Sequence, residues 1–388
     1  MNKYFQFFKS VLFLSVLLFG GCYHVCTEIE SELLVSESAI LRDGESWETI
    51  TDRELRSFTV NRPVRVRVVE GTSVEVTSFL SEEIADVSVW VESDLYPEPL
   101  RVLKLQRLKP LVQNVYLLPM IHSDGYLEGR SGKRHFIGKR ALFHDNELRF
   151  SVTSDDPLYR QITSLDVDWL IYFGNYDEPG KWPRINALYA REWIILMTNF
   201  AAVASFEELE VLLTGYYRQS NGKDAEFHRD DGSYFSSKQE YVDLLESIRR
   251  KPSFKLGVTS MGGGLGGGEV LGIDTWNFYS HYYGGSSILV HEFGHTLGYG
   301  HSSSFCYGEY EGYMAQIWAM LIRLEKLPYL SDELNGFYRP ENAQYRYNSV
   351  DQNMRKPRPN GQFNPPEQFL LNNPSVLPKT AAALEKFR

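Results

Sequence analysis

Cysteines, basic clusters, long apolar runs and internal repeats are all scarce in this chain of 388 residues. Three cysteines are too few for a disulfide-dense scaffold. The formal net charge is −10 and no group of Lys and Arg residues could follow a phosphate backbone, which argues against a nucleic acid partner. Hydrophobic residues make up 43% and charged residues 23%, the balance of a folded globular protein.

The N-terminus predicts an export signal over residues 1–21. Two lysines precede a largely apolar run from Val11 to Phe19, which is too short to span about 30 Å of hydrocarbon as a helix. Two glycines then stand directly before Cys22. This junction resembles the lipobox of bacterial lipoproteins, which implies lipid attachment at Cys22 and a membrane-anchored protein of the cell envelope or surface. Phe19 stands where that pattern usually has leucine, and an ordinary cleaved signal is the alternative.

The next two segments differ in polarity and in the periodicity of their apolar residues. Residues 22–54 are polar and acidic, which predicts a tether between the lipid anchor and the fold. Residues 55–175 show period-two alternation of valine with polar residues, as in "PVRVRVVEG" and "DVSVWVES". This alternation predicts strands, and the segment is therefore expected to be a β-rich, sandwich-like domain.

Helical spacing begins after a loop rich in proline and glycine. Residues 205–218 and 237–251 carry apolar side chains at helical intervals, and "SFKLGVTS" predicts a strand after them. The whole chain is thus expected to be of the α+β class, with a second domain over residues 176–335. Residues 336–388 are rich in Pro, Asn and Gln and are interpreted as a C-terminal extension.

The stretch "HEFGHTLGYGH", residues 291–301, contains three of the nine histidines. His291 and His295 are four apart, so on a helix they point the same way and can hold one metal ion. Glu292 lies about 100° around the helix, where it can hold a proton from a water molecule on the metal. Gly298 can end the helix and return the chain so that His301 adds a third nitrogen. Three protein ligands leave a fourth position open, as in catalytic zinc sites.

This stretch resembles the metzincin zinc metallopeptidases, whose motif is H-E-x-x-H-x-x-G-x-x-H. The match is complete over residues 291–301. The resemblance implies a metzincin-like catalytic domain with one catalytic Zn²⁺ on His291, His295 and His301. It also implies that Glu292 is the general base and that Gly298 makes the turn.

The family also has a methionine-containing turn beneath the metal, and the chain offers two candidates for it. One is Met314, at the start of an expected helix. The other, which we favour, is a compact turn in "HSSSFCYG", where Phe305 or Cys306 takes the place of the methionine and Tyr307 follows. Cys306 as a zinc ligand, or paired with Cys26, is a further alternative.

In metzincins an edge strand above the helix pairs with extended substrate. "GGEVLGIDTWNF", residues 267–278, is the candidate for this strand. Glycine fills six of the seven positions from Gly262 to Gly268, and this run is interpreted as a mobile lip, with a flexible loop of no role as the alternative.

The motif and the export signal together predict a surface-anchored zinc endopeptidase that cleaves extracellular proteins, including glycoproteins. The alternative is an adhesive or binding lipoprotein in which the β-rich domain recognises a partner and the zinc site is structural or vestigial. The presence of Glu292 favours the peptidase, since a zinc site that has lost its catalytic activity does not need a proton acceptor.

Overall fold

A computed structural model describes residues 33–69, 72–118, 124–139, 148–174, 181–206, 209, 227–259, 263–274, 287–306, 314, 317–318, 321 and 326–329. The export signal, Cys22, Cys26, Tyr307 and the C-terminal extension lie outside these residues. The fold is mixed α+β and divides into two compact units. Within the described ranges, no helix combines the length and apolar character needed to cross a membrane.

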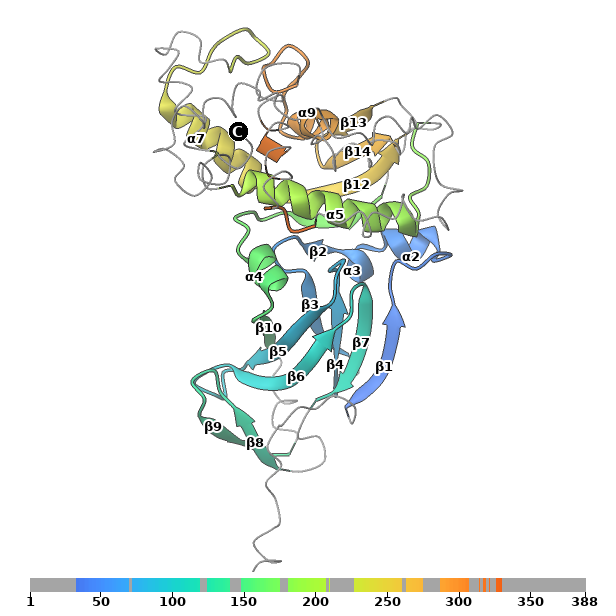
Figure 1. Ribbon diagram of the computed structural model, residues 1–388, viewed down its shortest axis with the longest axis vertical. Coiled ribbons are helices and arrows are strands. Elements are labelled where there is room, and N and C mark those ends of the chain that lie inside the picture. The colour runs from blue at the N-terminus through green and yellow to red at the C-terminus, as the bar shows by residue number, and fades with distance from the viewer. Residues whose placement is uncertain are drawn as a thin grey trace, which may run out of the picture. The chain divides into compact units, whose positions relative to one another are not determined.

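The first unit comes from Met1–Ser38, Val64–Ser78 and Glu83–Asp156 and is built of strands. One sheet has the order β1-β7-β4-β3, a second has the order β10-β5-β6, and β8 and β9 form a hairpin (Figure 1). The strands are β1 (Leu34–Ala39), β3 (Val64–Val69), β4 (Ser73–Ser78), β5 (Ile84–Glu92), β6 (Leu100–Leu108), β7 (Val112–Leu117), β8 (Gly125–Glu128), β9 (Arg134–Ile137) and β10 (Arg149–Ser154).

The valine alternation accounts for the core of this unit. Val74 and Val76 on β4 and Val87 and Val89 on β5 are fully buried, because successive even or odd positions of a strand share one face. The pairs β3–β4, β4–β7, β5–β6 and β5–β10 are antiparallel. A β-rich N-terminal region is therefore present, in agreement with the sequence.

The second unit comes from Ala39–Pro63, Phe79–Glu82 and Pro157–Arg388. Its five-stranded sheet has the order β13-β14-β12-β11-β2, with β11, β12 and β14 parallel and with β13 and β2 antiparallel at the two ends. Its elements are α2 (Trp47–Thr51), α3 (Arg53–Arg56), β2 (Phe58–Thr59), α4 (Pro157–Thr163), β11 (Leu170–Phe173), α5 (Ala187–Ala204), α7 (Lys238–Arg249), β12 (Ser253–Thr259), β13 (Gly264–Gly267), β14 (Val270–Asp274) and α9 (Ser287–Thr296).

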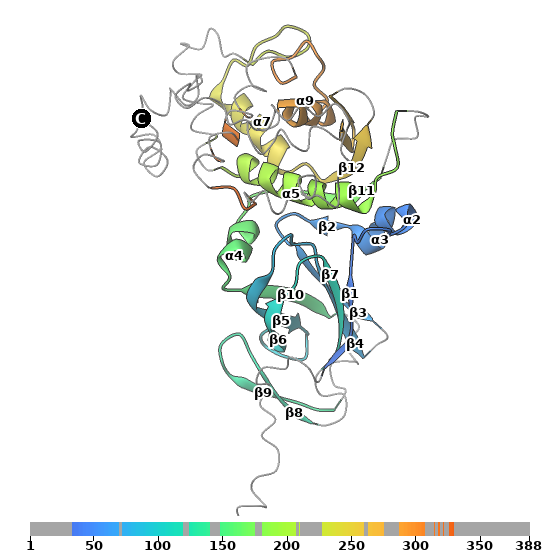
Figure 2. The ribbon, with the colours of Figure 1, turned by 45° about the vertical axis from the view of Figure 1, so that its right-hand side comes forward.

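An aromatic cluster joins α5, α9 and the sheet. Phe200 of α5 meets Phe293 of α9 edge to face with ring centroids 5.0 Å apart, and Phe293 lies 5.4 Å from Phe254 of β12. Trp169, next to β11, contacts all three rings. All four side chains are buried. Burial of such large side chains stabilises the placement of α9 on its sheet, and Figure 2 shows α5 and α9 beside these strands.

Two expected boundaries are wrong. Strand β11 was expected to close the β-rich domain that ends at residue 175, but it pairs with β12 in the sheet of the second unit. The expected tether, residues 22–54, contains β1 and α2 in its described part, and Ile50 is fully buried. Local alternation and polarity report how a segment meets solvent, but they do not report which distant strand it pairs with.

Candidate metal centre

Helix α9 carries the first two histidines and ends in a glycine turn. Gly298 has a φ of 92°, its N–H donates to the His295 carbonyl at 3.1 Å, and the Tyr299 N–H donates to the Gly294 carbonyl at 3.1 Å. This pair of bonds is a Schellman motif, which needs a left-handed residue after the last turn. The turn reverses the chain and brings residues 299–306 back beneath the helix.

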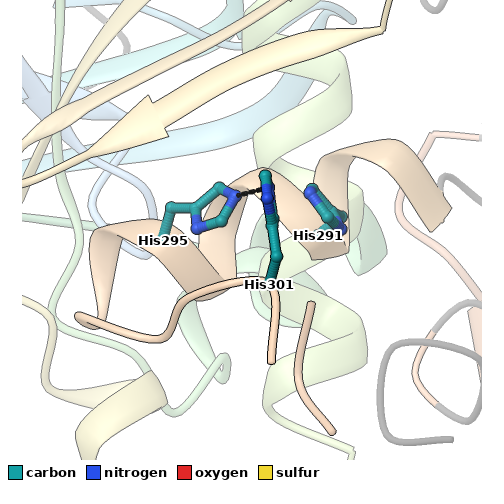
Figure 3. Close-up of side chains that lie close together, drawn as sticks. All are labelled: His291, His295 and His301. Atoms are coloured by element: carbon teal, nitrogen blue, oxygen red, sulfur yellow. Dashed lines mark hydrogen bonds between the residues drawn. The ribbon is translucent and has the colours of Figure 1, made fainter. Parts of the chain in front are cut away.

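Three imidazole rings converge at this point. His291 and His295 project from α9 and His301 from the loop that follows, as Figure 3 shows. Their ligand nitrogens all lie within 4.8 Å of one another, and the Nε2 atoms of His295 and His301 are 3.0 Å apart. The three rings go from buried at His291 to exposed at His301, so one side of the group faces solvent.

Backbone carbonyls set which nitrogen of two rings faces the centre. Nδ1 of His291 donates to the Cys306 carbonyl, and Nδ1 of His295 donates to the Tyr299 carbonyl at 2.7 Å. A carbonyl oxygen only accepts, so each Nδ1 carries the proton and each Nε2 keeps its lone pair for a metal. Burial lowers the pKa of His295, and the adjacent His291 and His301 lower it further, which favours the neutral form that binds metal.

The donor set fits zinc. Tetrahedral Zn²⁺ with Zn–N bonds of about 2.0–2.1 Å places its ligand nitrogens about 3.3 Å apart. The 3.0 Å separation of the His295 and His301 Nε2 atoms is close to this spacing. Three imidazole rings with an open side suit a zinc site that retains one exchangeable position.

Cys306 lies behind the rings and is not placed as a ligand. Its Sγ is 3.6 Å from Nδ1 of His295 and 3.4 Å from the Tyr299 carbonyl oxygen, on the side of the ring away from Nε2. The Cys306 side chain is fully buried. The alternative in which Cys306 binds the metal is therefore wrong. Of the turn candidates, Cys306 is the residue whose sulfur lies against a histidine ring, and Met314 is buried in a helical position.

Glu292 is held against strand β13. It is 7% exposed, and the backbone of β13 passes so close to it that a Cβ atom on Gly264 would overlap its side chain. A Cβ atom on Gly266 would overlap the Glu292 backbone carbonyl. The glycines therefore permit direct contact between the strand and the helix that carries the histidines.

This packing corrects the expected edge strand. Residues 267–278 were the candidate, but β14 within that segment pairs on both sides, with β12 and with β13. Among the strands that the structure describes, the edge position belongs to β13, Gly264–Gly267, inside the glycine run. The interpretation of the run as a mobile lip is therefore wrong for these four residues, since they form an ordered strand whose glycines serve close packing.

A cavity of about 700 Å³ opens between β13 and the histidines. Its walls include the three histidines and Glu292, together with Leu265 of β13, Ile288 of α9 and Tyr299. Such a volume accommodates several residues of an extended peptide or a small-molecule ligand. The Tyr299 ring stacks on Phe305 at 5.4 Å, and burial raises the pKa of its hydroxyl.

Two supports of this centre were not predicted from the sequence. Asp230 accepts hydrogen bonds from the backbone on either side of His301, and Lys251 donates to the carbonyls of Thr296, at the end of α9, and Gly268, after β13. Both residues are distant in sequence from the motif. The "DDG" at residues 230–232 is typical of a turn, but such a pattern does not indicate which distant residues the turn contacts.

Comparison of the chain with protein-family models, with curated proteins and with solved structures gives no match.

Proposed function

We propose that this protein is a zinc-dependent endopeptidase of metzincin type that acts on extracellular proteins, including glycoproteins. The main support for this proposal is that three histidines, whose ligand nitrogens point toward one another, and one buried glutamate line the same cavity. An edge strand of the described sheet borders this cavity. Export and lipid attachment at Cys22 remain predictions of the sequence and belong to the same proposal.

His291, His295 and His301 would hold the metal through Nε2, since Nδ1 of the first two is already bonded to carbonyls. Zinc bound there supplies Lewis acidity toward a water molecule and toward a peptide carbonyl. The carbonyl bonds fix the ring planes before any ion binds, which lowers the cost of assembling the site.

Glu292 is assigned the proton transfers. Its side chain follows His291 on the same helix and lines the same cavity as the three histidines. From that position the carboxylate takes a proton from water and later delivers it to the leaving amine of the cleaved peptide bond. The close approach of Gly264 leaves no room for even a Cβ atom beside the Glu292 side chain, and the carboxylate belongs to the residue that lines the cavity.

Strand β13 is assigned the binding of substrate. It is the last strand of the described sheet on the side of the cavity, and its backbone borders Glu292. An extended peptide can add to such an edge through main-chain hydrogen bonds. Leu265, Ile288 and Tyr299 give the cavity apolar walls, which favours substrates with apolar side chains near the cleaved bond.

The test is a measurement of bound zinc and of cleavage of casein and a mucin-type glycoprotein. The Glu292→Gln variant is expected to keep one zinc per chain and to lose about 10²–10⁴-fold in cleavage rate, the usual contribution of general acid–base catalysis. Glu246→Gln is the matched control, because Glu246 is exposed on α7 in the same unit. It should cleave like the wild type.

Two other results would count against the proposal. A folded protein that binds no zinc would remove the site itself. Zinc bound tightly without cleavage of any tested protein would favour the adhesive or binding lipoprotein, in which the metal has a structural role.

A further inference from the structure

A short hairpin, residues 227–235, lies along the loop that carries His301. His228 and Tyr234 form its bridge. Asp230 accepts from the Gly300 N–H through Oδ2 at 2.7 Å and from the Ser302 N–H through Oδ1 at 3.1 Å. The two donors are the residues immediately before and after His301, so one carboxylate holds the backbone on both sides of the third ligand.

The hairpin is attached to the same loop at a second point. The Ser304 N–H donates to the His228 carbonyl at 3.0 Å, and the His228 N–H donates to Ser304 Oγ at 2.9 Å. Contact at Gly300 is close, because a Cβ atom there would lie 2.7 Å from Asp230 Oδ1. The hairpin is therefore bonded to the loop at two separate points, and the contact of Asp230 is part of this larger attachment.

The loop needs such an attachment. His301 follows the helix stop at Gly298, lies outside any helix or strand, and is exposed. Fixing a loop residue costs backbone entropy, and without such an attachment this cost would weaken metal binding. His291 and His295 do not have this cost, since α9 already orders them.

We propose that Asp230 is a positioning residue for the metal centre, which holds His301 in place so that the third imidazole is preorganised for zinc. The inference rests on the proposed zinc site. The hairpin that contains Asp230 lies about 70 residues upstream of His301, and we expect it to raise the affinity of the site for the metal. It does so because backbone N–H groups beside His301 donate to a charged carboxylate, and such hydrogen bonds are stronger than those between neutral groups.

The chain offers a matched control one residue away. Asp231 carries the same charge on the same hairpin but accepts from Ser233, through N–H at 2.9 Å and Oγ at 2.6 Å, within the hairpin turn. Replacing it removes one negative charge from the neighbourhood of the site and leaves the bonds around His301 intact.

The experiment measures zinc affinity of the full chain by competition with a chromogenic chelator. Asp230→Ala should weaken zinc binding by about 10–100-fold, the usual cost of losing a residue that orients a ligand. Asp230→Asn should weaken it less, because its carbonyl oxygen can still accept one bond. Asp231→Ala should bind zinc like the wild type. In cobalt-substituted protein, Asp230→Ala should change the visible absorption bands, which report the number and geometry of ligands.

Each outcome decides the matter. Wild-type affinity and an unchanged cobalt spectrum in Asp230→Ala would overturn the inference while leaving the proposed peptidase intact. An equal loss in Asp231→Ala would overturn it too, since charge alone would then explain the effect. No zinc binding by the wild type would overturn the proposed function along with it. If Asp230→Ala does not fold without metal, the Asp230→Asn measurement decides.

Discussion

At the scale of single residues, the contact between Glu292 and strand β13 depends on two glycines, which have no side chain. Gly264 faces the Glu292 side chain and Gly266 faces its backbone carbonyl. A flexible side chain can move aside for a methyl group, whereas a helix backbone cannot move without disturbing the packing of α9.

The two glycines therefore predict different outcomes. Gly264→Ala should displace the Glu292 carboxylate and lower the cleavage rate by about 10-fold or more while zinc binding persists. Gly266→Ala should instead lower stability by about 1–3 kcal/mol, the cost of overpacking, and weaken zinc binding as well. Cleavage assays, zinc titration and thermal unfolding of both variants measure these effects.

Glu246→Gln on α7 is again the control, since Glu246 is exposed and lies outside the cavity and the contact between β13 and α9. A Gly264→Ala variant with wild-type activity would show that Glu292 has room that the structure does not give it. Equal stability of the two glycine variants would contradict the distinction between side-chain and backbone contact.

The residues of the centre differ in how far sequence could predict them. The spacing of His291, His295 and His301 carries its own geometry, because a helical turn and a glycine stop are local. Asp230 could not be predicted in this way. Its partners are the backbone N–H groups of Gly300 and Ser302, which leave no side-chain signature in the sequence.

At the scale of elements, the start of α7 is joined to the hairpin of residues 227–235. Glu240 accepts from Arg229 at 2.5 Å and from the N–H groups of Ser236 and Ser237 at 2.6 and 3.0 Å. These hydrogen bonds, with that from Arg229 the largest contribution, lower the pKa of Glu240 from its ordinary value of 4.5 to about 2. The hairpin that holds the His301 loop is thus itself held by α7.

This arrangement predicts an acid dependence. A lowered pKa means that the Glu240 carboxylate stabilises the fold fully above about pH 4.5 and loses this effect as the pH falls toward about 2. Glu240→Gln should be about 1 kcal/mol less stable than the wild type at pH 7, as for loss of a helix cap, and the difference should shrink across that window. Thermal unfolding of both proteins from pH 7 to pH 2.5 measures it, with Glu246→Gln on the same helix as the control. A difference that stays constant with pH would contradict this reading of Glu240.

The glycine run shows why an element can be misread from sequence. Its composition indicates backbone freedom, and freedom was taken as mobility. The same composition is required when two backbones come into contact, as β13 and α9 do here. The two cases differ only in what packs against the glycines, and that partner, Glu292, is more than twenty residues further along the chain.

At the scale of the whole molecule, the chain crosses between its two units several times. The alternation of residues 55–175 was enough to predict a β-rich region. Of the strands that the structure describes in the first unit, β3 to β10 lie within this range, whereas β1 lies in the segment expected to be a tether. It was not enough to predict that β2 and β11 leave that region and pair with each other in the second unit. Short strands of this kind are assigned by long-range pairing, for which one sequence gives no signal.

The division into units predicts where zinc acts. Zinc at about 1,000 times its dissociation constant should stabilise the native state by about 4 kcal/mol, and the effect should appear in the second unit. Hydrogen exchange should slow on zinc addition in α9, in β13 and in residues 299–306, with no change in β5 and β6. The Glu292→Gln variant should show the same pattern, since its histidines are intact. Slower exchange confined to the first unit would contradict the placement of the site.

The carbonyls that orient His291 and His295 have a consequence for how this site can evolve. Every amino acid carries a backbone carbonyl, so the orientation supplied from positions 299 and 306 does not depend on which side chains stand there. The tautomers of both histidines therefore depend on the path of the backbone and not on which residues stand at positions 299 and 306. Relatives of this protein are therefore free to vary at Tyr299 and Cys306 and still present the same nitrogens, whereas an insertion or deletion between residues 296 and 299 would shift both carbonyls relative to the rings, and one between residues 299 and 306 would shift that of Cys306.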